Sequence, residues 1–599
     1  MSDFPLPGRP EMPVPLTLDE RGYCALPPAP QPEGEKRSAP GVYSGWTFPK
    51  YNGFYRHSLY VQVRDGTRLA LDYYIPALEG AEETEPLPVV WQFTPYGRCS
   101  CRDGVIRPGG SPAHLAAFLR HGYVVAGAEV RGTGASFGIR DVTNNPYDQK
   151  DGRDINEWIW RQPWCSGRIG MLGGSYVGQT ILSTLAGQPE HLACAFITCT
   201  DFNKFDGWVR GGIARRFGAG NPDVPLERQL ASAVPVDDDQ DRTLLTQAVK
   251  QHARNGPQTG PFEELHCRDD WSEQADGVYW NMVSASSYKD RINATGAAVY
   301  LHGGLFDVFR RDTFVMYRNL TVPKKLLVGP WYHCGETGFD MASEQLRFFD
   351  HWLKDVPNGI MEEKPIFLKT QFMPEGRDWS FHDVWPLPGT ENRSVFFAEG
   401  GRLRFEPALT EGGGDDYTAR YDILTGVESG DTADLDAKAL VYTSEPLPAD
   451  LCVTGHPLAS LWVTADQEDA DFFVCLTDVA PDGATFLVTE GHLRASHRKT
   501  AEPPYDFLGL PWHPSGQGDI RPLRRGQPTR LDIDLMPTSY VLRKGHCLRV
   551  EISNHLRGFY ALESDPPAKL RLHRDCLYQS YIALPTADTS SLSGTEEAR

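Results

Sequence analysis

A serine between glycines is the first candidate for chemistry in this sequence. Ser175 lies in the hexapeptide GGSYVG (173–178), after a short apolar run and before an expected helix. That layout is typical of a nucleophile elbow, a sharp strand-to-helix turn that exposes a serine hydroxyl at the edge of a sheet. Glycines are needed because a Cβ beside the crowded turn would clash. The usual pattern has glycine two residues after the serine, whereas here it comes one residue later, at Gly178.

A serine hydroxyl is a weak nucleophile near neutral pH, so an elbow implies a base and an acid that orients the base. Asp307 follows one expected strand in HGGLFDVF (302–309), and His333 follows the next in GPWYHCG (329–335). The carboxyl ends of parallel strands meet at one edge of a sheet. We therefore predict that Ser175 is the nucleophile, His333 the base and Asp307 the acid, in a chain order that one large group of α/β enzymes uses.

Two tyrosines are placed where negative charge would develop during attack on a carbonyl. The backbone N–H of Tyr176 directly follows the nucleophile, and Tyr96 lies in a loop after an expected strand, where the glycine run of lipases is absent. A phenol can donate the second hydrogen bond to an oxyanion. We predict an oxyanion hole formed by the Tyr96 hydroxyl and the Tyr176 N–H. The alternative role for Tyr96 is a half-buried aromatic over the sheet edge.

Three aromatic residues flank the predicted acid and base in sequence: Phe306, Phe309 and Trp331. They predict an aromatic substrate pocket. Each of them is also compatible with core packing, because large aromatic side chains dominate protein interiors.

The segments around these residues predict the sheet that positions them. Alternating residues at 60–64 and 69–74 flank Asp65-Gly66, a hairpin turn signal. Apolar runs at 88–93, 123–128, 193–199, 297–301 and 325–328 alternate with helical patterns at 112–121, 151–161 and 342–353. Apolar strands that alternate with helices indicate a parallel sheet covered on both faces.

Its composition and residue patterns divide the chain into an N-terminal arm, an interrupted α/β domain and a β-rich domain. Residues 1–50 are rich in proline and predict an extended N-terminal arm. Residues 51–202 and 294–360 carry the predicted catalytic domain, which the polar segment 203–293 interrupts as an expected helical cap. Residues 361–599 contain short alternating segments punctuated by Gly, Pro and Asp, and predict a β-sandwich of the jelly-roll type.

Composition excludes several classes of partner. The formal net charge of −20 would repel nucleic acid and anionic membranes, so we expect neither as a partner. The first residues show no basic segment followed by an apolar one, and no apolar run reaches about 18 residues. The twelve cysteines are scattered without metal-ligand spacing. We therefore predict a cytoplasmic enzyme with free thiols and no metal site.

Several motifs together resemble one family of serine hydrolases, which includes cocaine esterase, the α-amino-acid ester hydrolases and the X-Pro dipeptidyl-peptidases. The resemblance covers residues 55–585. The matching stretches are VRDG (63–66), TPY (94–96), VRGTGAS (130–136), QPW (162–164), GGSYVG (173–178), GPWYH (329–333), ADFF (470–473) and DVAPDG (478–483). In that family the elbow reads Gly-x-Ser-Tyr-x-Gly, which is where Gly178 falls.

The resemblance implies an α/β-hydrolase core, a helical cap inserted before the acid and a C-terminal jelly roll. It also implies the same triad of Ser175, Asp307 and His333, with Tyr96 and Tyr176 in the oxyanion hole. The family needs no cofactor. A small-molecule ester or amide is the expected substrate, and a homodimer is compatible with the family.

Three functions stay open at this stage. The leading one is a carboxylic-ester hydrolase that works through an acyl-enzyme. The same triad would serve an amidase, a β-lactam acylase, an X-Pro type peptidase or an acyltransferase, and an inactive fold used as a binding module is the third. Amino-acid ester hydrolases hold the substrate ammonium with extra carboxylates, whereas here Asp307 is followed by Val308, Phe309, Arg310 and Arg311. That difference disfavours α-amino substrates and the X-Pro peptidase role.

Overall fold

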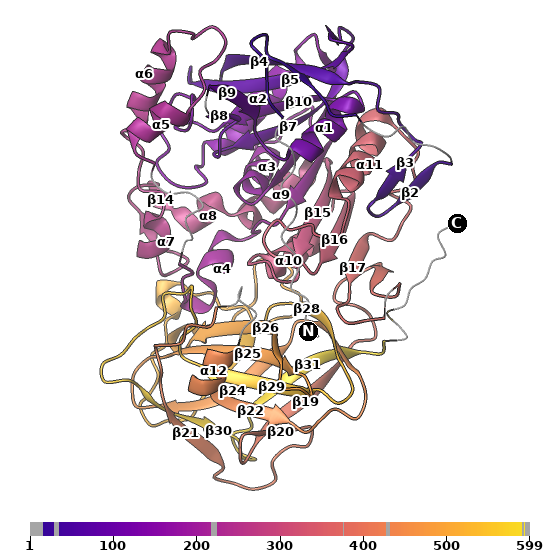
Figure 1. Cartoon of the computed structure of the whole chain (residues 1–599). Coiled ribbons are helices and arrows are strands. Elements are labelled where there is room, and N and C mark those ends of the chain that lie inside the picture. The colour runs from indigo at the N-terminus through magenta and orange to yellow at the C-terminus, as the bar shows by residue number, and fades with distance from the viewer. Residues whose placement is uncertain are drawn as a thin grey trace.

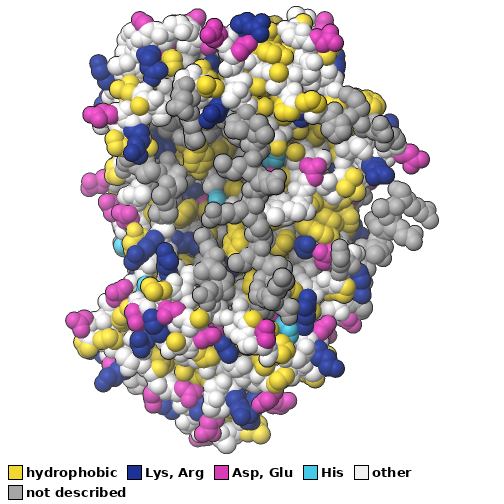
Figure 2. Space-filling model, in the orientation of Figure 1, with side chains coloured by type: hydrophobic (Ala, Val, Ile, Leu, Met, Phe, Trp, Pro, Cys, Tyr) yellow, Lys and Arg dark blue, Asp and Glu magenta, His cyan; other side chains and the backbone are white. Residues whose placement is uncertain are grey.

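The computed structural model describes residues 16–28, 35–102, 104–216, 224–374, 376–426, 432–589 and 592. These residues form two units, each built on one large β-sheet, with the later strands gathered in the second unit (Figure 1). Acidic and basic side chains are interspersed over both units on the face shown in Figure 2. None of the helices in the described ranges combines the length and the apolar character needed to cross a membrane.

A 12-stranded sheet forms the centre of the first unit, in the order β1-β4-β5-β10-β7-β11-β12-β15-β16-β17-β18, with β6 paired to β5. Within the stretch from β10 to β17, every pair of neighbouring strands is parallel. The remaining pairs, which include β5 with β10 and β17 with β18, are antiparallel. The strands are β1 (Tyr23–Ala25), β4 (Gly53–Gln62), β5 (Arg68–Leu78), β6 (Ala81–Glu82), β7 (Leu87–Thr94), β10 (Val124–Glu129), β11 (Cys165–Gly174), β12 (Cys194–Thr198), β15 (Ala298–Gly304), β16 (Lys324–Gly329), β17 (Ile366–Lys369) and β18 (Trp379–His382).

Helices cover both faces of this sheet, as the apolar strands predict. The helices α1 (Pro112–Arg120) and α11 (Met341–Lys354) pack on one face. The other face carries α2 (Asp148–Trp160), α3 (Tyr176–Ala186), α9 (Lys289–Ala294) and α10 (Arg310–Asn319). In α2, Ile155 and Ile159 are one helical turn apart and both fully buried, because an amphipathic helix presents such positions to the core.

A largely helical segment is inserted between β12 and β15. It lies beside the sheet in Figure 1, where α4 approaches the second unit. Its elements are α4 (Lys204–Trp208), η1 (Arg210–Gly212), α5 (Leu226–Ser232), α6 (Thr243–His252), α7 (Gly260–Glu264), β13 (Trp271–Ser272), β14 (Gly277–Val278), α8 (Tyr279–Val283) and η2 (Ala285–Tyr288), followed by α9. Within this segment, Nη2 of Arg210 lies 3.1 Å from Oε2 of Glu490 in the second unit.

The second unit is a 13-stranded, almost entirely antiparallel sheet system with its own apolar core. Only β20 and β22 pair in parallel among its described strands. The strands are β19 (Glu391–Ala398), β20 (Arg402–Arg404), β21 (Gly414–Thr418), β22 (Leu440–Ser444), β23 (Leu451–Gly455), β24 (Leu458–Ala465), β25 (Asp471–Val479), β26 (Thr485–Arg494), β27 (Thr529–Asp534), β28 (Thr538–Leu542), β29 (Cys547–Ser553), β30 (Lys569–His573) and β31 (Tyr581–Ala587), with the helical pieces α12 (Ala433–Lys438), η3 (Ala495–His497) and η4 (Gln517–Asp519).

The structure corrects the predicted boundary at residue 361. Strand β17 pairs in parallel with β16, and β18 pairs with β17, so residues 366–382 extend the first sheet. The short apolar run 366–369 has no feature that separates an edge strand of the first sheet from the strands of the second.

The proline-rich arm is more ordered in part than its composition suggests. Strand β1 pairs with β4 at the edge of the first sheet, and β2 (Arg37–Ala39) forms a hairpin with β3 (Val42–Ser44). Tyr43 of this hairpin donates a hydrogen bond to Asp350 of α11 at 2.9 Å. The arm's residues 1–15 and 29–34 lie outside the described residues.

Candidate active site

Ser175 stands at the turn between β11 and α3, where the sequence predicts an elbow. Its backbone has φ 57° and ψ −125°, a rare conformation for a residue other than glycine. A Cβ added to Gly173 would lie 2.3 Å from Cγ1 of Val177, and one added to Gly178 would lie 3.0 Å from Cβ of Thr200. Glycine is therefore required at position 178 for steric reasons, because the first turn of α3 packs against the segment after β12.

The predicted acid and base lie in neighbouring loops, Asp307 after β15 and His333 after β16. Nδ1 of His333 is 2.6 Å from Oδ2 of Asp307. The other carboxylate oxygen accepts the backbone N–H of Phe309 at 2.6 Å. The Asp307 side chain is 1% exposed and that of His333 38% exposed. A buried carboxylate therefore fixes the imidazole through Nδ1 and leaves Nε2 for chemistry.

The elbow adjoins the loop that carries the predicted base. A Cβ added to Gly174 would lie 3.0 Å from Sγ of Cys334, the residue after His333. The strands β11, β12, β15 and β16 are consecutive neighbours in the sheet. The structure thus brings Ser175, Asp307 and His333 to one edge of the sheet.

The surroundings of His333 favour its protonated form. Burial lowers the pKa of the imidazole, but the hydrogen bonds and charges of Asp307 and Cys334 outweigh burial and raise that pKa above its ordinary value. The pKa of the Cys334 thiol is lowered in turn, through contacts with Cys199 and His333. The imidazole of His333 and the thiol of Cys334 therefore interact, and each shifts the pKa of the other.

Tyr96, in the loop after β7, reaches the elbow. The side chain of Ser175 and the backbone N–H of Tyr176 are close enough to its phenol to lower the phenol's pKa. Desolvation raises the pKa of Tyr96, so the phenol stays protonated near neutral pH and keeps a proton to donate. The ring of Tyr176 stands edge-on to that of Tyr96, with 6.3 Å between centroids. Both predicted donors therefore lie beside the nucleophile.

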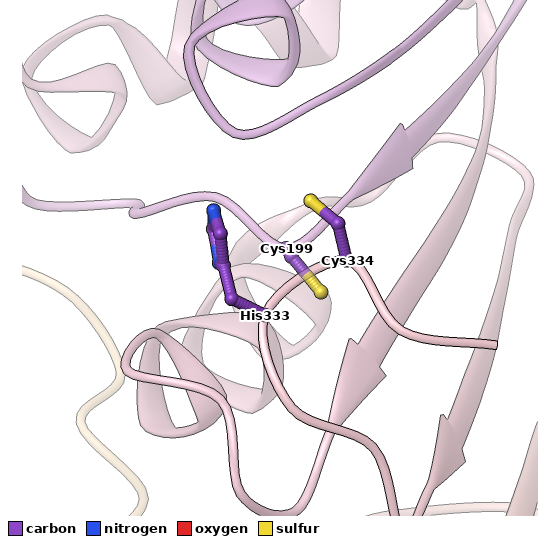
Figure 3. A group of neighbouring side chains, drawn as sticks. All are labelled: Cys199, His333 and Cys334. Atoms are coloured by element: carbon purple, nitrogen blue, oxygen red, sulfur yellow. The ribbon is translucent and has the colours of Figure 1, made fainter. Parts of the chain in front are cut away.

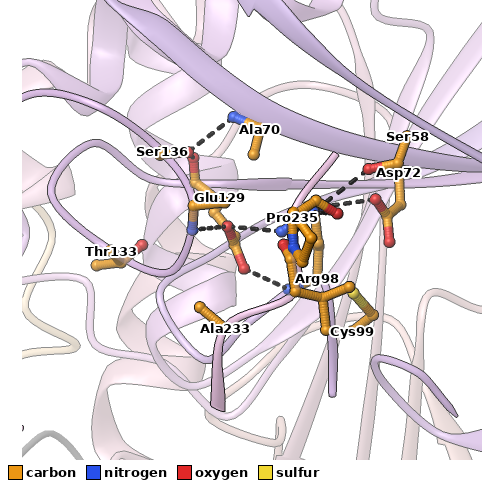
Figure 4. Close-up of polar contacts among 12 residues, drawn as sticks. Ser58, Ala70, Asp72, Arg98, Cys99, Glu129, Thr133, Ser136, Ala233 and Pro235 are labelled. Atoms are coloured by element: carbon orange, nitrogen blue, oxygen red, sulfur yellow. Dashed lines mark hydrogen bonds and ion pairs between the residues drawn. The ribbon is translucent and has the colours of Figure 1, made fainter. Parts of the chain in front are cut away.

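A buried ionic network holds the loop that carries Tyr96 (Figure 4). Nε of Arg98 lies 2.6 Å from Oδ1 of Asp72, and its Nη1 lies 3.0 Å from Oε2 of Glu129. Its Nη2 donates to the carbonyl of Val234 at 2.7 Å. One side chain thus ties the Tyr96 loop to β5, to β10 and to the inserted helical segment.

Replacing Arg98 with methionine is expected to destabilise the first unit. The change removes the cation that the buried carboxylates of Asp72 and Glu129 share. Such a loss typically costs about 3–5 kcal/mol of unfolding free energy. A lower urea midpoint of unfolding would report the loss. Arg402→Met is the matched control, because Arg402 pairs with Glu445 at an exposed site and such pairs contribute about 0–1 kcal/mol. Equal midpoints for the two variants would contradict the structural role of Arg98.

Of the predicted pocket residues Phe306 and Phe309, one contacts the base and the other faces the second unit. The ring centroid of Phe309 is 5.7 Å from that of His333, in an edge-on contact. Phe306 turns toward the second unit, where its ring centroid is 5.6 Å from that of Phe486. Only Phe309 thus borders the imidazole directly.

Trp331 is a correction to the predicted pocket. It is 1% exposed and packs within the core between the sheet and α11. Its Nε1 donates to the carbonyl of Thr337 at 2.9 Å. A side chain enclosed on all sides cannot line a substrate pocket. Its sequence position two residues before His333 was misleading, because the loop turns this tryptophan back into the core.

Several residues that the structure places at the site are not among those predicted from the sequence. Arg98 and Glu129 support the Tyr96 loop from the segment after β7 and from β10. Cys199 and Cys334 lie with His333 in one group whose potential metal-ligand atoms are all within 4.8 Å of one another. A weak signal was present, since Cys199 lies at the end of a predicted strand and Cys334 directly follows the predicted base.

Two arginines after the acid connect the units. Nη1 of Arg311 is 3.0 Å from Oδ2 of Asp534, and Nη2 of Arg310 is 3.5 Å from Oε1 of Glu490. Both arginine side chains are buried. The second unit therefore holds the start of α10, directly after the loop that presents Asp307.

Comparison with known proteins shows the family to which this chain belongs. A family model described as X-Pro dipeptidyl-peptidase (S15 family) matches residues 65–335, and one described as the X-Pro dipeptidyl-peptidase C-terminal non-catalytic domain matches residues 353–560. A Mycobacterium bovis protein named as a candidate serine esterase is 32% identical over 624 residues, covering 92% of this chain and 98% of that protein. The chain therefore belongs to the S15 family of serine hydrolases and esterases, which confirms the predicted resemblance.

Individual relatives carry esterase and hydrolase names. Cocaine esterase of Rhodococcus is 26% identical over 601 residues, covering 88% of this chain and 97% of that protein. A solved CocE/NonD family hydrolase of Staphylococcus aureus has a TM-score of 0.70 at 17% identity, covering 90% of this chain and 94% of its own. An α-amino acid ester hydrolase has a TM-score of 0.67 at 19% identity, covering 89% and 97%. These structures share the fold, an α/β-hydrolase-like core with a C-terminal non-catalytic domain.

Proposed function

We propose that this protein hydrolyses a small carboxylic ester through an acyl-enzyme. Oγ of Ser175 attacks the carbonyl while Nε2 of His333 takes its proton, and Asp307 holds the imidazole. The Tyr96 hydroxyl and the Tyr176 N–H stabilise the oxyanion. The alcohol leaves with the proton from His333. Water, deprotonated by the same nitrogen, then releases the acid.

The observation that carries this proposal is the convergence at one sheet edge. The 2.6 Å contact between Asp307 and His333 orients the base, and the strained turn presents Ser175 at the same edge of the sheet. The contacts of the Tyr96 hydroxyl with Ser175 and with the Tyr176 N–H support an oxyanion hole at the same place. A binding module would have no need for three such features together.

Ester cleavage is favoured over X-Pro peptidase action by the residues after the acid. A dipeptidyl substrate presents an ammonium that needs carboxylates, and the positions after Asp307 carry Arg310 and Arg311. Both arginines are engaged by acidic residues of the second unit. We also propose that the second unit is a jelly roll, that the inserted helical segment caps the site, and that the enzyme is cytoplasmic and needs no cofactor. A homodimer is compatible with the family.

A pair of substrates with one acyl group tests the bond preference. The p-nitrophenyl ester and the p-nitroanilide of the same unbranched acid differ only in the leaving atom, and Xaa-Pro p-nitroanilide represents the peptidase role. We expect kcat/KM to be highest for the ester. A higher kcat/KM for the Xaa-Pro anilide would replace the esterase proposal with the peptidase alternative. An acyl-transfer product in the presence of a competing alcohol would indicate a transferase.

Tyr96→Phe is expected to lower kcat about 10²–10³-fold, the usual effect of losing one oxyanion donor. The ring stays in place and only the hydroxyl is lost, so KM should change little. Steady-state kinetics on the ester give both constants. Tyr147→Phe, at another exposed tyrosine, is the control and should leave kcat unchanged. A Tyr96→Phe enzyme with wild-type kcat would remove Tyr96 from the oxyanion hole.

The raised pKa of His333 predicts the pH profile. Only the neutral imidazole can take the serine proton, so kcat/KM should rise with pH through a midpoint above about 6.5, the ordinary histidine value. Cys334→Ser removes one of the groups that raise this pKa, so its midpoint should move to lower pH. The measurement is the kcat/KM profile of both proteins on one ester. An unchanged or higher midpoint in the variant would contradict the assigned cause.

A further inference from the structure

We propose that Cys199, Cys334 and His333 form a binding site for Zn²⁺, and that occupation of this site reversibly inhibits the enzyme. Cys199 follows β12 directly, and the other two residues come from the loop after β16 (Figure 3). One sulfur from each cysteine and one ring nitrogen of the histidine lie within 4.8 Å of one another. Two thiolates and an imidazole are ligands that Zn²⁺ prefers.

The distances suit a tetrahedral ion after small side-chain rotations. Zn–S bonds of about 2.3 Å and Zn–N bonds of about 2.0 Å place neighbouring ligand atoms roughly 3.5–3.8 Å apart. Cys334 is exposed, and its sulfur already lies within 4.8 Å of the other two ligand atoms. Cys199 is held, because its backbone N–H donates to the carbonyl of His302 at 2.8 Å. Three protein ligands leave the fourth position to water.

A carboxylate already orients the histidine as metal sites require. Metal-bound histidines usually donate their second ring N–H to a carboxylate, which fixes the ring and raises its basicity. Nδ1 of His333 lies 2.6 Å from Oδ2 of the buried Asp307, so Nε2 is the nitrogen available to a metal. The exposed side of His333 gives the ion a path from solvent. On binding, the two thiols release their protons to water.

The inhibitory consequence follows from the position of Nε2. The same nitrogen takes the proton of Ser175 in the proposed function, so a bound ion would remove the base. Cys334 also lies against the elbow, since a Cβ on Gly174 would approach its Sγ to 3.0 Å. This consequence rests on the proposed function, whereas binding of the ion does not.

Direct binding is tested first, without reference to activity. Calorimetric titration of the full-length protein with Zn²⁺ should show one tight site in the wild type and in Ser175→Ala. Co²⁺ should give a thiolate-to-cobalt charge-transfer band. Cys334→Ser and Cys199→Ser should weaken Zn²⁺ binding by more than about 10-fold, because even partners outside the ligand set change affinity by 10–100-fold. Cys576→Ser, at an exposed cysteine of the second unit, should bind as the wild type does.

These outcomes separate the proposal of a Zn²⁺ site from the proposed role of His333 as the catalytic base. Equal affinity in the wild type and Cys334→Ser, or a cobalt complex without the thiolate band, would overturn the site. Cys334 is exposed, so this variant decides the matter if buried Cys199→Ser fails to fold. Tight binding with inhibition that a chelator reverses supports the full proposal. Tight, cysteine-dependent binding without inhibition would keep the metal site and contradict the role of His333 as base.

Discussion

Replacing Ser175 with alanine is expected to lower kcat/KM on a p-nitrophenyl ester by at least about 10⁴-fold, because the acyl-enzyme can no longer form. The residual rate would come from the oxyanion donors and substrate binding alone. The loss should appear in kcat, with little change in substrate affinity. Progress curves at high enzyme concentration would measure the residual rate, and circular dichroism would establish that the variant is folded.

Ser183→Ala is the matched control for this variant. Ser183 lies on the same helix α3, two turns from the elbow, and is partly buried. Its loss should leave kcat/KM within a few-fold of wild type. A Ser175→Ala enzyme that keeps more than a tenth of the wild-type rate would show that another residue is the nucleophile.

Asp307→Asn is expected to reduce kcat about 10⁴-fold while the protein stays folded. The amide keeps the shape of the side chain but can present an N–H to Nδ1 of His333, which forces the proton onto Nε2 and removes the base. The buried position of Asp307 and its contact to the Phe309 N–H prevent water from replacing it. The measurement is kcat at saturating ester.

Asp312→Asn is the control for a buried carboxylate near the acid. Asp312 lies in α10, and one of its oxygens accepts the backbone N–H groups of Phe202 and Asn203. An asparagine oxygen can accept the same bonds, and burial already raises the pKa of Asp312 to about 6. Its kcat should therefore stay near wild type. A similar loss in both variants would indicate general disruption of α10 rather than a catalytic role for Asp307.

The sequence could predict the elements that present the site, because their patterns depend on local composition. The apolar runs at 88–93, 193–199 and 325–328 correspond to β7, β12 and β16, and the late Gly178 is explained by packing on Thr200. Residues that follow such strands are placed by the topology of a parallel sheet. For this reason Asp307 and His333 could be paired from the sequence alone.

Features that depend on side-chain direction could not be predicted. Trp331 and Phe309 have similar sequence positions relative to the base and acid, and both are buried. Trp331 packs in the core between the sheet and α11, whereas Phe309 borders the imidazole. The support of the Tyr96 loop by Arg98 joins segments distant in the chain, and no short motif records such a contact. Likewise, the strand ends that carry Cys199 and Cys334 could be predicted, but the directions of the two side chains that bring their sulfurs together could not.

The most direct test of the central claim is covalent labelling by a fluorophosphonate. This reagent reacts with serines that a catalytic site activates and not with ordinary serines. Intact mass after labelling, followed by peptide mapping, locates the adduct. We predict one adduct per chain, on Ser175, absent in Ser175→Ala and formed far more slowly in Asp307→Asn. An adduct on a different serine, or no adduct on folded wild-type protein, would contradict the claim that Ser175 is an activated nucleophile.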